Sequence, residues 1–132
     1  MNVCLIGSGI STLYFASKYP FKSYYGFDFS NKLIAIALKN RVKFFERYKL
    51  SLDIRFHVHD ANEFKLSQKS VLFMFNPFGR ETIKKMVFNN LNFLKDSNSI
   101  ILYANDHHSD FLNKYGNQIN RDAEYNLSYI KF

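Results

Sequence analysis

The fold is decided at Val3-Cys4-Leu5-Ile6-Gly7-Ser8-Gly9, where an apolar run passes directly into a glycine turn. A helix is predicted at residues 10–19, and a second apolar run then ends at Asp28. This spacing is typical of a nucleotide-binding βαβ unit. Glycine lets the backbone turn tightly and approach a ligand without a Cβ in the way. A carboxylate after the second strand can accept hydrogen bonds from a ribose diol, so we expect an adenosine-containing ligand.

The rest of the chain alternates between strand-like and helix-like segments. Strands are predicted at residues 2–6, 23–28, 53–58, 71–75, 99–104 and 124–131, and helices at 10–19, from the N-cap Ser30 to about 48, at 80–94 and around 111–115. Residues 117–122 are polar and are predicted to form a loop. The alternation predicts a single α/β domain over residues 1–132, with a doubly wound, mostly parallel sheet in three α/β/α layers.

Hydrophobic patterns predict which strands are central, which lie at an edge, and which residues are buried. Residues 71–75 are continuously apolar, which is typical of a central strand covered on both faces. Residues 53–58 alternate, which predicts an edge strand with Ile54, Phe56 and Val58 on its buried face. The helix after Ser30 is expected to bury one apolar stripe, made of Ile34, Ala37, Leu38, Phe45 and Tyr48.

Composition limits the class of protein. The 132-residue chain has no apolar run of about 18 residues, so no membrane span is expected. Its N-terminus does not read as a signal peptide, and Cys4 is the single cysteine, which together predict a reduced, cytoplasmic protein. The net charge of +7 fits either a polyanionic partner or a general compositional bias. The basic stripe Lys39, Lys43 and Arg47 is consistent with a solvated helix face.

Polar residues and glycines follow the predicted strands. In an open α/β sheet, ligands bind beyond the carboxyl ends of the strands, so these residues are the candidate site. In chain order they are Gly7-Ser8-Gly9, Asp28, His59-Asp60-Ala61, Asn76-Pro77-Phe78-Gly79 and Asn105-Asp106-His107-His108.

With these motifs in order, the sequence resembles the class I S-adenosylmethionine-dependent methyltransferases over nearly its whole length. The glycine-rich motif of that family matches Ile6-Gly7-Ser8-Gly9, and its ribose-binding acid matches Asp28, with Phe29 beside it. Its third-strand acid, which lies close to the adenine, matches Asp60-Ala61. The resemblance implies a Rossmann-like methyltransferase fold, S-adenosyl-L-methionine as the cofactor, and transfer of its methyl group to an acceptor.

The resemblance also implies where the acceptor binds. The fourth-strand motif of the family matches Asn76-Pro77-Phe78, so Asn76 would also lie beside the cofactor, accept hydrogen bonds from a target nitrogen, and leave Phe78 to stack on a flat substrate. Either His107 or His108 could act as a general base for an oxygen nucleophile. The acceptor is expected to be a small molecule or a sugar, with RNA as the alternative.

Some positions depart from the family pattern. Leu5 stands where an acid that orients the methionine end of the cofactor is usual, Ser11 stands where a third glycine is common, and the C-terminal hairpin is expected to be cut to one strand. These departures favour a second hypothesis, in which the chain is a non-catalytic partner subunit. They also lead us to expect that a homodimer or a larger partner subunit completes the cofactor site. A third hypothesis is a flavin- or nicotinamide-binding protein. Thr12 argues against it, because it stands where that motif needs a glycine for close helix–strand packing.

Each candidate also has a purely structural interpretation. Asp28 could cap the next helix together with Ser30, and Asp60 could be an ordinary turn aspartate. His57 and His59 share one strand face but have no third ligand at a recognised spacing, so no metal site is predicted.

Overall fold

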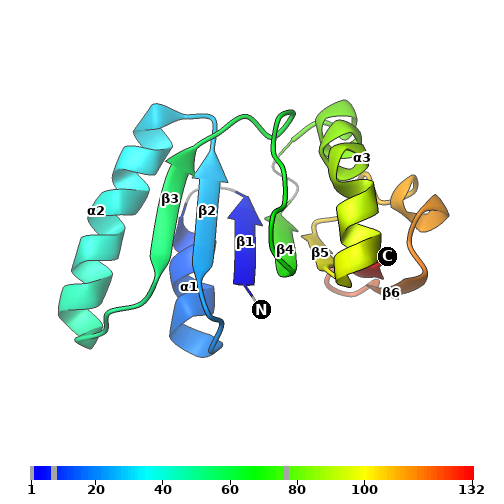
Figure 1. Cartoon of the computed structure of the whole chain (residues 1–132). Helices are drawn as coiled ribbons and strands as arrows, with labels where there is room; N and C mark the ends of the chain where they lie inside the picture. Colours follow the sequence, from blue (N-terminus) through cyan, green and yellow to red (C-terminus); the bar gives the residue numbers. More distant parts are fainter. Residues whose placement is uncertain (1, 7–8, 76–77) are drawn as a thin grey trace.

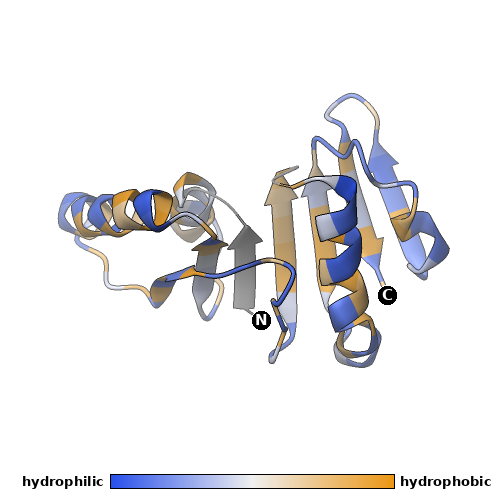
Figure 2. Cartoon of the chain, turned by 90° about the horizontal axis from the view of Figure 1, so that it is seen from above, coloured by the Kyte–Doolittle hydropathy of each residue, from blue (hydrophilic) through white to orange (hydrophobic). Residues whose placement is uncertain are grey.

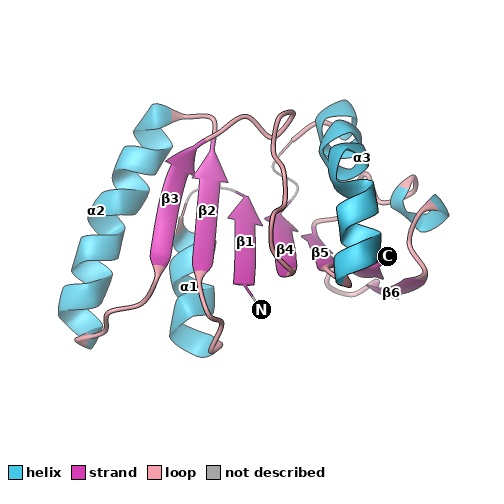
Figure 3. Ribbon diagram, viewed as in Figure 1, coloured by secondary structure: helices cyan, strands magenta, loops and turns pink. Residues whose placement is uncertain are grey.

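The structure is a computed structural model that describes residues 2–6, 9–75 and 78–132, and of residues 2–6 it describes the backbone only. It contains one seven-stranded sheet in the order β3-β2-β1-β4-β5-β7-β6 (Figure 1). The strands are β1 (Asn2–Ile6), β2 (Tyr24–Asp28), β3 (Ile54–Val58), β4 (Ser70–Phe75), β5 (Ile100–Ala104), β6 (Gln118–Asp122) and β7 (Leu127–Lys131). The helices are α1 (Ile10–Lys18), α2 (Asn31–Tyr48) and α3 (Arg80–Ser97), with a short 3-10 turn, η1 (Leu112–Lys114) (Figure 3).

The sheet is mixed. Strands β3, β2, β1, β4 and β5 pair in parallel, whereas β7 lies antiparallel between β5 and β6. The predicted α/β fold is therefore confirmed, with an antiparallel hairpin added at one edge. The strand order reverses between β1 and β4, which is the point where ligands bind in open α/β sheets.

Helices pack on both faces of the sheet (Figure 2). Neighbouring residues on a strand point to opposite faces, and β4 shows the consequence. Val71 joins the core under α1 and α2, while Leu72 and Met74 join the core under α3. Among the described helices, none has the length and hydrophobicity needed to cross a lipid bilayer.

Local signals explain where α2 begins and ends. The hydroxyl of Ser30 accepts a hydrogen bond from the Leu33 amide at 3.3 Å, as its predicted role of N-cap requires. The helix ends at Lys49, whose backbone takes the left-handed conformation. Ile34 and Ala37 are buried as predicted, but Leu38 and Tyr48 are exposed, because α2 meets the sheet along a narrower face than the apolar stripe suggested.

Two strand ends are also more exposed than predicted. Val58 on β3 and Phe75 on β4 are the last residues of their strands, and both are exposed. At these positions the parallel strands have reached their carboxyl ends, where no helix of the described chain covers them. The prediction of burial on both faces holds for Val71 on one face and for Leu72 and Met74 on the other, but was wrong for Phe75.

The C-terminal region differs most from its prediction. The predicted loop at 117–122 is strand β6, and the strand predicted at 124–131 begins only at Leu127, after a turn. The hairpin is therefore complete, and the expectation of a single strand was wrong. Strand β6 is an exposed edge strand in which only Ile119 packs against the core, so backbone pairing with β7 defines it rather than hydrophobic alternation.

Candidate functional site

The parallel strands bring the candidate residues to one edge of the sheet, which we call the carboxyl edge. The register places Asp28 opposite Val58 and Phe75 opposite Ala104. Gly9, Asp60, Phe78 and His107 each come directly or shortly after a strand that ends there, and Asp28 is the last residue of β2. Gly7, Ser8, Asn76 and Pro77 lie outside the described residues, and Ile6 is described only as the last backbone position of β1.

Gly9 has a conformation and a surrounding that require glycine. Its φ of 76° is left-handed, and it immediately precedes the first residue of α1. A Cβ at this position would lie 2.5 Å from the Cβ of Ala37 and 3.3 Å from the ring of Phe56. The turn therefore fixes the start of α1 against α2, with no side chain above the backbone.

Close packing between α1 and β2 is achieved by a glycine on the strand. Thr12 on α1 is only 1% exposed, and its hydroxyl oxygen lies 2.8 Å from where a Cβ on Gly26 would be. The dinucleotide-binding pattern has this glycine on the helix, at the position that Thr12 occupies here. Gly26 provides the missing space from the opposite side, so the absence of a third helix glycine does not prevent close packing here.

Asp28 has a structural role in the turn to α2. Its Oδ1 accepts a hydrogen bond from the Ser30 amide at 2.8 Å, which braces the residue that caps α2. This is close to the structural interpretation given for Asp28 above. Among the described residues, Oδ2 has no hydrogen-bond partner, so it could accept from a ligand hydroxyl. Phe29 beside it is 70% exposed and presents a flat apolar surface at the same edge.

Asp60 forms the turn that follows β3. Its Oδ1 accepts hydrogen bonds from both the backbone amide and the side-chain amide of Asn62, at 2.8 and 2.9 Å. These hydrogen bonds lower the pKa of the Asp60 carboxyl. Ala61 is buried in the core under α3. Asp60 is thus a turn aspartate, and its carboxylate remains exposed at the carboxyl edge.

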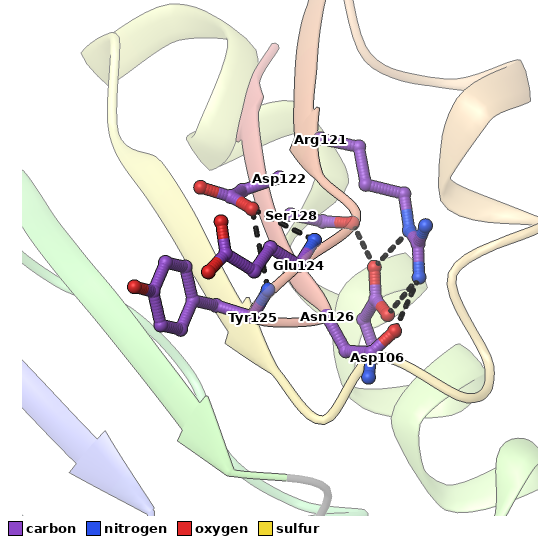
Figure 4. A network of polar contacts seen from close by, with 7 residues as sticks. All are labelled: Asp106, Arg121, Asp122, Glu124, Tyr125, Asn126 and Ser128. Atoms are coloured by element: carbon purple, nitrogen blue, oxygen red, sulfur yellow. Dashed lines mark hydrogen bonds and ion pairs between the residues drawn. The ribbon is translucent and has the colours of Figure 1, made fainter.

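Asp106, two residues after β5, carries a buried charge, and the sequence placed it among the candidate residues without giving it a role. Asp106 is 4% exposed and accepts two hydrogen bonds from Arg121 on β6, at 2.8 and 2.9 Å. The hydroxyl of Ser128 on β7 donates a further one (Figure 4). Arg121 is the main cause of the lowered pKa of the Asp106 carboxyl. The predicted base, His107, is exposed beside it, and its backbone amide donates to the Asn105 carbonyl.

The same network positions the turn between β6 and β7. Arg121 also donates to the side-chain oxygen of Asn126 at 3.0 Å, while Asp122 accepts from the Glu124 and Tyr125 amides. Tyr125 is 69% exposed and extends away from Arg121 (Figure 4). Because Leu127 pairs with Ala104, this turn lies at the carboxyl edge. The sequence predicted a strand from residue 124, so it did not indicate a turn at Tyr125.

A second ion pair joins the start of α3 to the segment after β5. Arg80, the first residue of α3, donates to the Asp110 carboxylate, and its guanidinium lies 5.6 Å from the centre of the Phe111 ring. Asp110 raises the pKa of Arg80, and Arg80 lowers that of Asp110. No local sequence signal could have identified this pair, because its members are far apart in the chain. Among the described residues, no group of three or more His, Cys, Asp or Glu side chains could hold a metal ion.

Comparisons with known proteins identify the fold. No protein-family model and no curated protein sequence matches the chain. Solved structures do match: magnesium protoporphyrin IX methyltransferase from Synechocystis PCC 6803 with bound SAM aligns at a TM-score of 0.69 and 16% identity, over 98% of this chain and 69% of that one.

RNA-modifying enzymes give similar alignments. A putative tRNA methyltransferase from Streptococcus pneumoniae aligns at a TM-score of 0.60 and 19% identity, over 98% of this chain and 61% of that one. A putative rRNA methylase from Clostridium thermocellum aligns at a TM-score of 0.63 and 13% identity, over 97% of this chain and 84% of that one. At these identities the likeness shows the fold alone, and that fold is the one found in class I SAM-dependent methyltransferases, as the sequence motifs predicted.

Proposed function

We propose that this chain binds S-adenosyl-L-methionine at the carboxyl edge and transfers its methyl group to an acceptor. One observation supports this most strongly. Gly9 follows β1, Asp28 ends β2 and Asp60 follows β3, so these three matches to the family motifs lie at the carboxyl ends of neighbouring parallel strands. Two structural neighbours, from Synechocystis PCC 6803 and M. capricolum, hold SAM or SAH, which is consistent with such a site in this fold.

The residues present fit the chemistry of the cofactor. Asp28 keeps one carboxylate oxygen for a ribose hydroxyl while the other holds the Ser30 amide. The exposed ring of Phe29 offers apolar contact to an adenine. Hydrogen bonds from Asn62 lower the pKa of Asp60, and its exposed carboxylate can accept a hydrogen bond from an amino group.

On the acceptor side, the chain supplies positioning groups. When bound, S-adenosylmethionine provides an electrophilic methyl group. Asn76 and Pro77, with Phe78, are proposed to orient the acceptor, and His107 to remove a proton from an oxygen nucleophile. The exposed ring of Tyr125 adds a second flat surface at this edge. Holding the nucleophile in line would then be the main catalytic contribution.

Titration calorimetry with S-adenosylmethionine tests the proposal directly. We expect saturable binding of one equivalent, and S-adenosylhomocysteine competing for it. Binding without methyl transfer to small-molecule, sugar or RNA acceptors would favour the second hypothesis, a non-catalytic subunit. If neither compound binds a chain that melts cooperatively, the proposed cofactor site is wrong.

Asn76 separates cofactor binding from turnover. Asn76→Ala is expected to lower the single-turnover rate on the true acceptor, while the dissociation constant for the cofactor stays within about threefold, or less than about 0.7 kcal/mol. A collapse of cofactor affinity with a normal rate at saturation would remove Asn76 from the acceptor site.

A further inference from the structure

A groove of about 360 Å³ lies away from the helices α1 and α2, on the opposite face of β2 and β3. Tyr25, Phe27 and His57 line its floor. Its outer wall is residues 64–70, the later part of the connection from β3 to β4. Figure 1 shows this connection passing over the sheet on the side of α3. We call this feature the β2–β3 groove.

Buried side chains on α3 hold the outer wall in place. Asn90 is buried, and its Oδ1 accepts from the Leu66 amide at 2.6 Å while its Nδ2 donates to the Phe64 carbonyl at 2.9 Å. The ring of Phe64 stacks on Phe27, with centroids 4.4 Å apart. The first part of the wall is thus anchored at Phe64 and Leu66, so this side of the groove is preformed, as ligand sites usually are.

The floor of the groove presents flat π surfaces next to a cation. The rings of Tyr25 and His57 are inclined by only 20°, with centroids 6.4 Å apart. The Arg55 guanidinium carbon lies 5.5 Å from the centre of the Tyr25 ring. His57 is exposed, so part of this surface is open to solvent. Such a surface suits a planar heteroaromatic ring, which can stack on tyrosine or imidazole and carry its anionic group toward the arginine.

Charge around the groove favours an anion. None of the described residues that line it is acidic, whereas Lys65, His57 and His59 are among them. The wider segment, residues 30–70, holds nine of the 18 lysines and arginines but only four of the 11 acidic residues. Five of these nine lie on α2, on the opposite face of the sheet, so the cations at the groove are Lys65, which lines it, and Arg55 beside Tyr25, which is also paired with Asp53.

We propose that the β2–β3 groove binds single-stranded nucleic acid. One base stacks on Tyr25 and His57, and the flanking phosphates lie near Arg55 and Lys65. A free nucleotide shares the base and one phosphate, but only a strand has a phosphate on each side of the base, one for Arg55 and one for Lys65. Stacking on aromatic rings within a positive groove is the general way in which proteins bind unpaired strands. The proposal goes beyond the methyl transfer proposed above and does not depend on it.

Fluorescence anisotropy with a labelled oligoadenosine RNA and the full chain tests the proposal. The single strand should bind at least about tenfold more tightly than a duplex of the same length, because paired bases cannot stack on the protein. Affinity should fall steeply as salt rises, because phosphate contacts release counterions. AMP alone should compete only weakly. Equal affinity for strand and duplex, or equal competition by AMP, would overturn the proposal.

Two variants locate the binding. Tyr25→Leu keeps an apolar side chain but removes the stacking ring, and His57→Glu places a negative charge in the groove. Each should weaken RNA binding by about tenfold or more. Lys114→Gln changes the net charge by the same amount as His57→Glu but lies on η1, across the sheet from β3, so it should change the affinity by less than about twofold. If both groove variants bind RNA as the wild type does, the groove is not the site.

A cofactor competition keeps this result separate from the proposed methyl transfer. Saturating S-adenosylhomocysteine should leave RNA affinity within about twofold, and so should Asp28→Asn, because both act at the carboxyl edge. RNA displaced by S-adenosylhomocysteine would place the strand at that edge and would overturn the groove assignment. RNA binding by a chain that binds no cofactor would support the groove while contradicting the proposed function.

Discussion

A Cβ on Gly9 would lie 2.5 Å from the Cβ of Ala37, so α2 packs directly against the turn that begins α1. This contact joins the two helices on one face of the sheet at the carboxyl edge. Because φ of Gly9 is also left-handed, two independent constraints require glycine at a position proposed to lie beside the cofactor.

Gly9→Ala should therefore destabilise the fold as well as weaken cofactor binding. We expect a loss of about 2–4 kcal/mol in the free energy of unfolding, from left-handed strain and overpacking together. Urea unfolding measures it. Gly79→Ala is the matched control, because a Cβ there would meet no atom within 4 Å, and its stability should change by less than about 1 kcal/mol. Equal effects of the two variants would contradict the packing argument.

Thr12→Val should stabilise the protein. The Thr12 hydroxyl is buried and has no hydrogen-bond partner among the described residues, while valine has nearly the same shape without the polar atom. Removing an unpaired buried hydroxyl should raise the free energy of unfolding by about 1 kcal/mol. Thermal melting checks this, with the partly exposed Ser11→Ala as the control. A lower melting temperature for Thr12→Val would mean that the hydroxyl does find a partner.

Asp28→Asn should weaken S-adenosylmethionine binding with little change in stability. The asparagine oxygen can still accept from the Ser30 amide, so the turn to α2 is kept, but the ribose loses a charged acceptor. The expected loss is about 1–3 kcal/mol of binding free energy, measured by calorimetry. Asp53→Asn removes the same charge at the other end of β3, where Asp53 pairs with Arg55, and should leave affinity unchanged. Unchanged affinity in Asp28→Asn would exclude the ribose role.

The Asp106–Arg121 pair should give a pH-dependent stability. Arg121 lowers the pKa of Asp106, so its contribution is complete at neutral pH and is lost as pH falls below about 4, through the folded-state pKa. At pH 7, Arg121→Met should cost about 1–3 kcal/mol, because a buried carboxylate loses its partner. The difference from wild type should shrink once Asp106 is protonated.

Urea unfolding of the Arg121 variant at pH 7 and near pH 3 measures that change. Arg55→Met is the comparison, because both Arg55 and its partner Asp53 are largely exposed, and its cost should stay below about 1 kcal/mol. A cost for Arg121→Met that is the same at both pH values would show that the ion pair is not its origin.

Asn90→Leu should release the connection between β3 and β4. It removes the acceptor of the Leu66 amide and the donor to the Phe64 carbonyl, with an expected loss of about 2–4 kcal/mol in stability. Hydrogen exchange at the Leu66 amide should become faster than in the wild type. Asn92→Ala, an exposed position on the same helix, should leave both quantities unchanged. Protection of Leu66 in Asn90→Leu would show that other contacts hold this wall.

Much of the architecture follows from local sequence. The apolar run into the glycine turn, the N-cap Ser30 and the alternation of Ile54 and Phe56 each predicted an element that the structure contains. The reason is that parallel strands and their covering helices bury long apolar segments, and these leave a clear periodicity. The residues that follow such strands could be placed at one edge for the same reason, because parallel strands end together.

Tertiary structure alone decided the rest. Strand β6 has no periodicity to read, because it is an exposed edge whose residues are specified by pairing with β7 and by the bond from Arg121 to Asp106. Thr12 lies close to Gly26, and Asn90 holds the β3–β4 connection. No sequence spacing predicts either contact. Sequence determined what each segment could bury by itself, whereas contacts between distant polar and small residues depend on where the packed core brings them together.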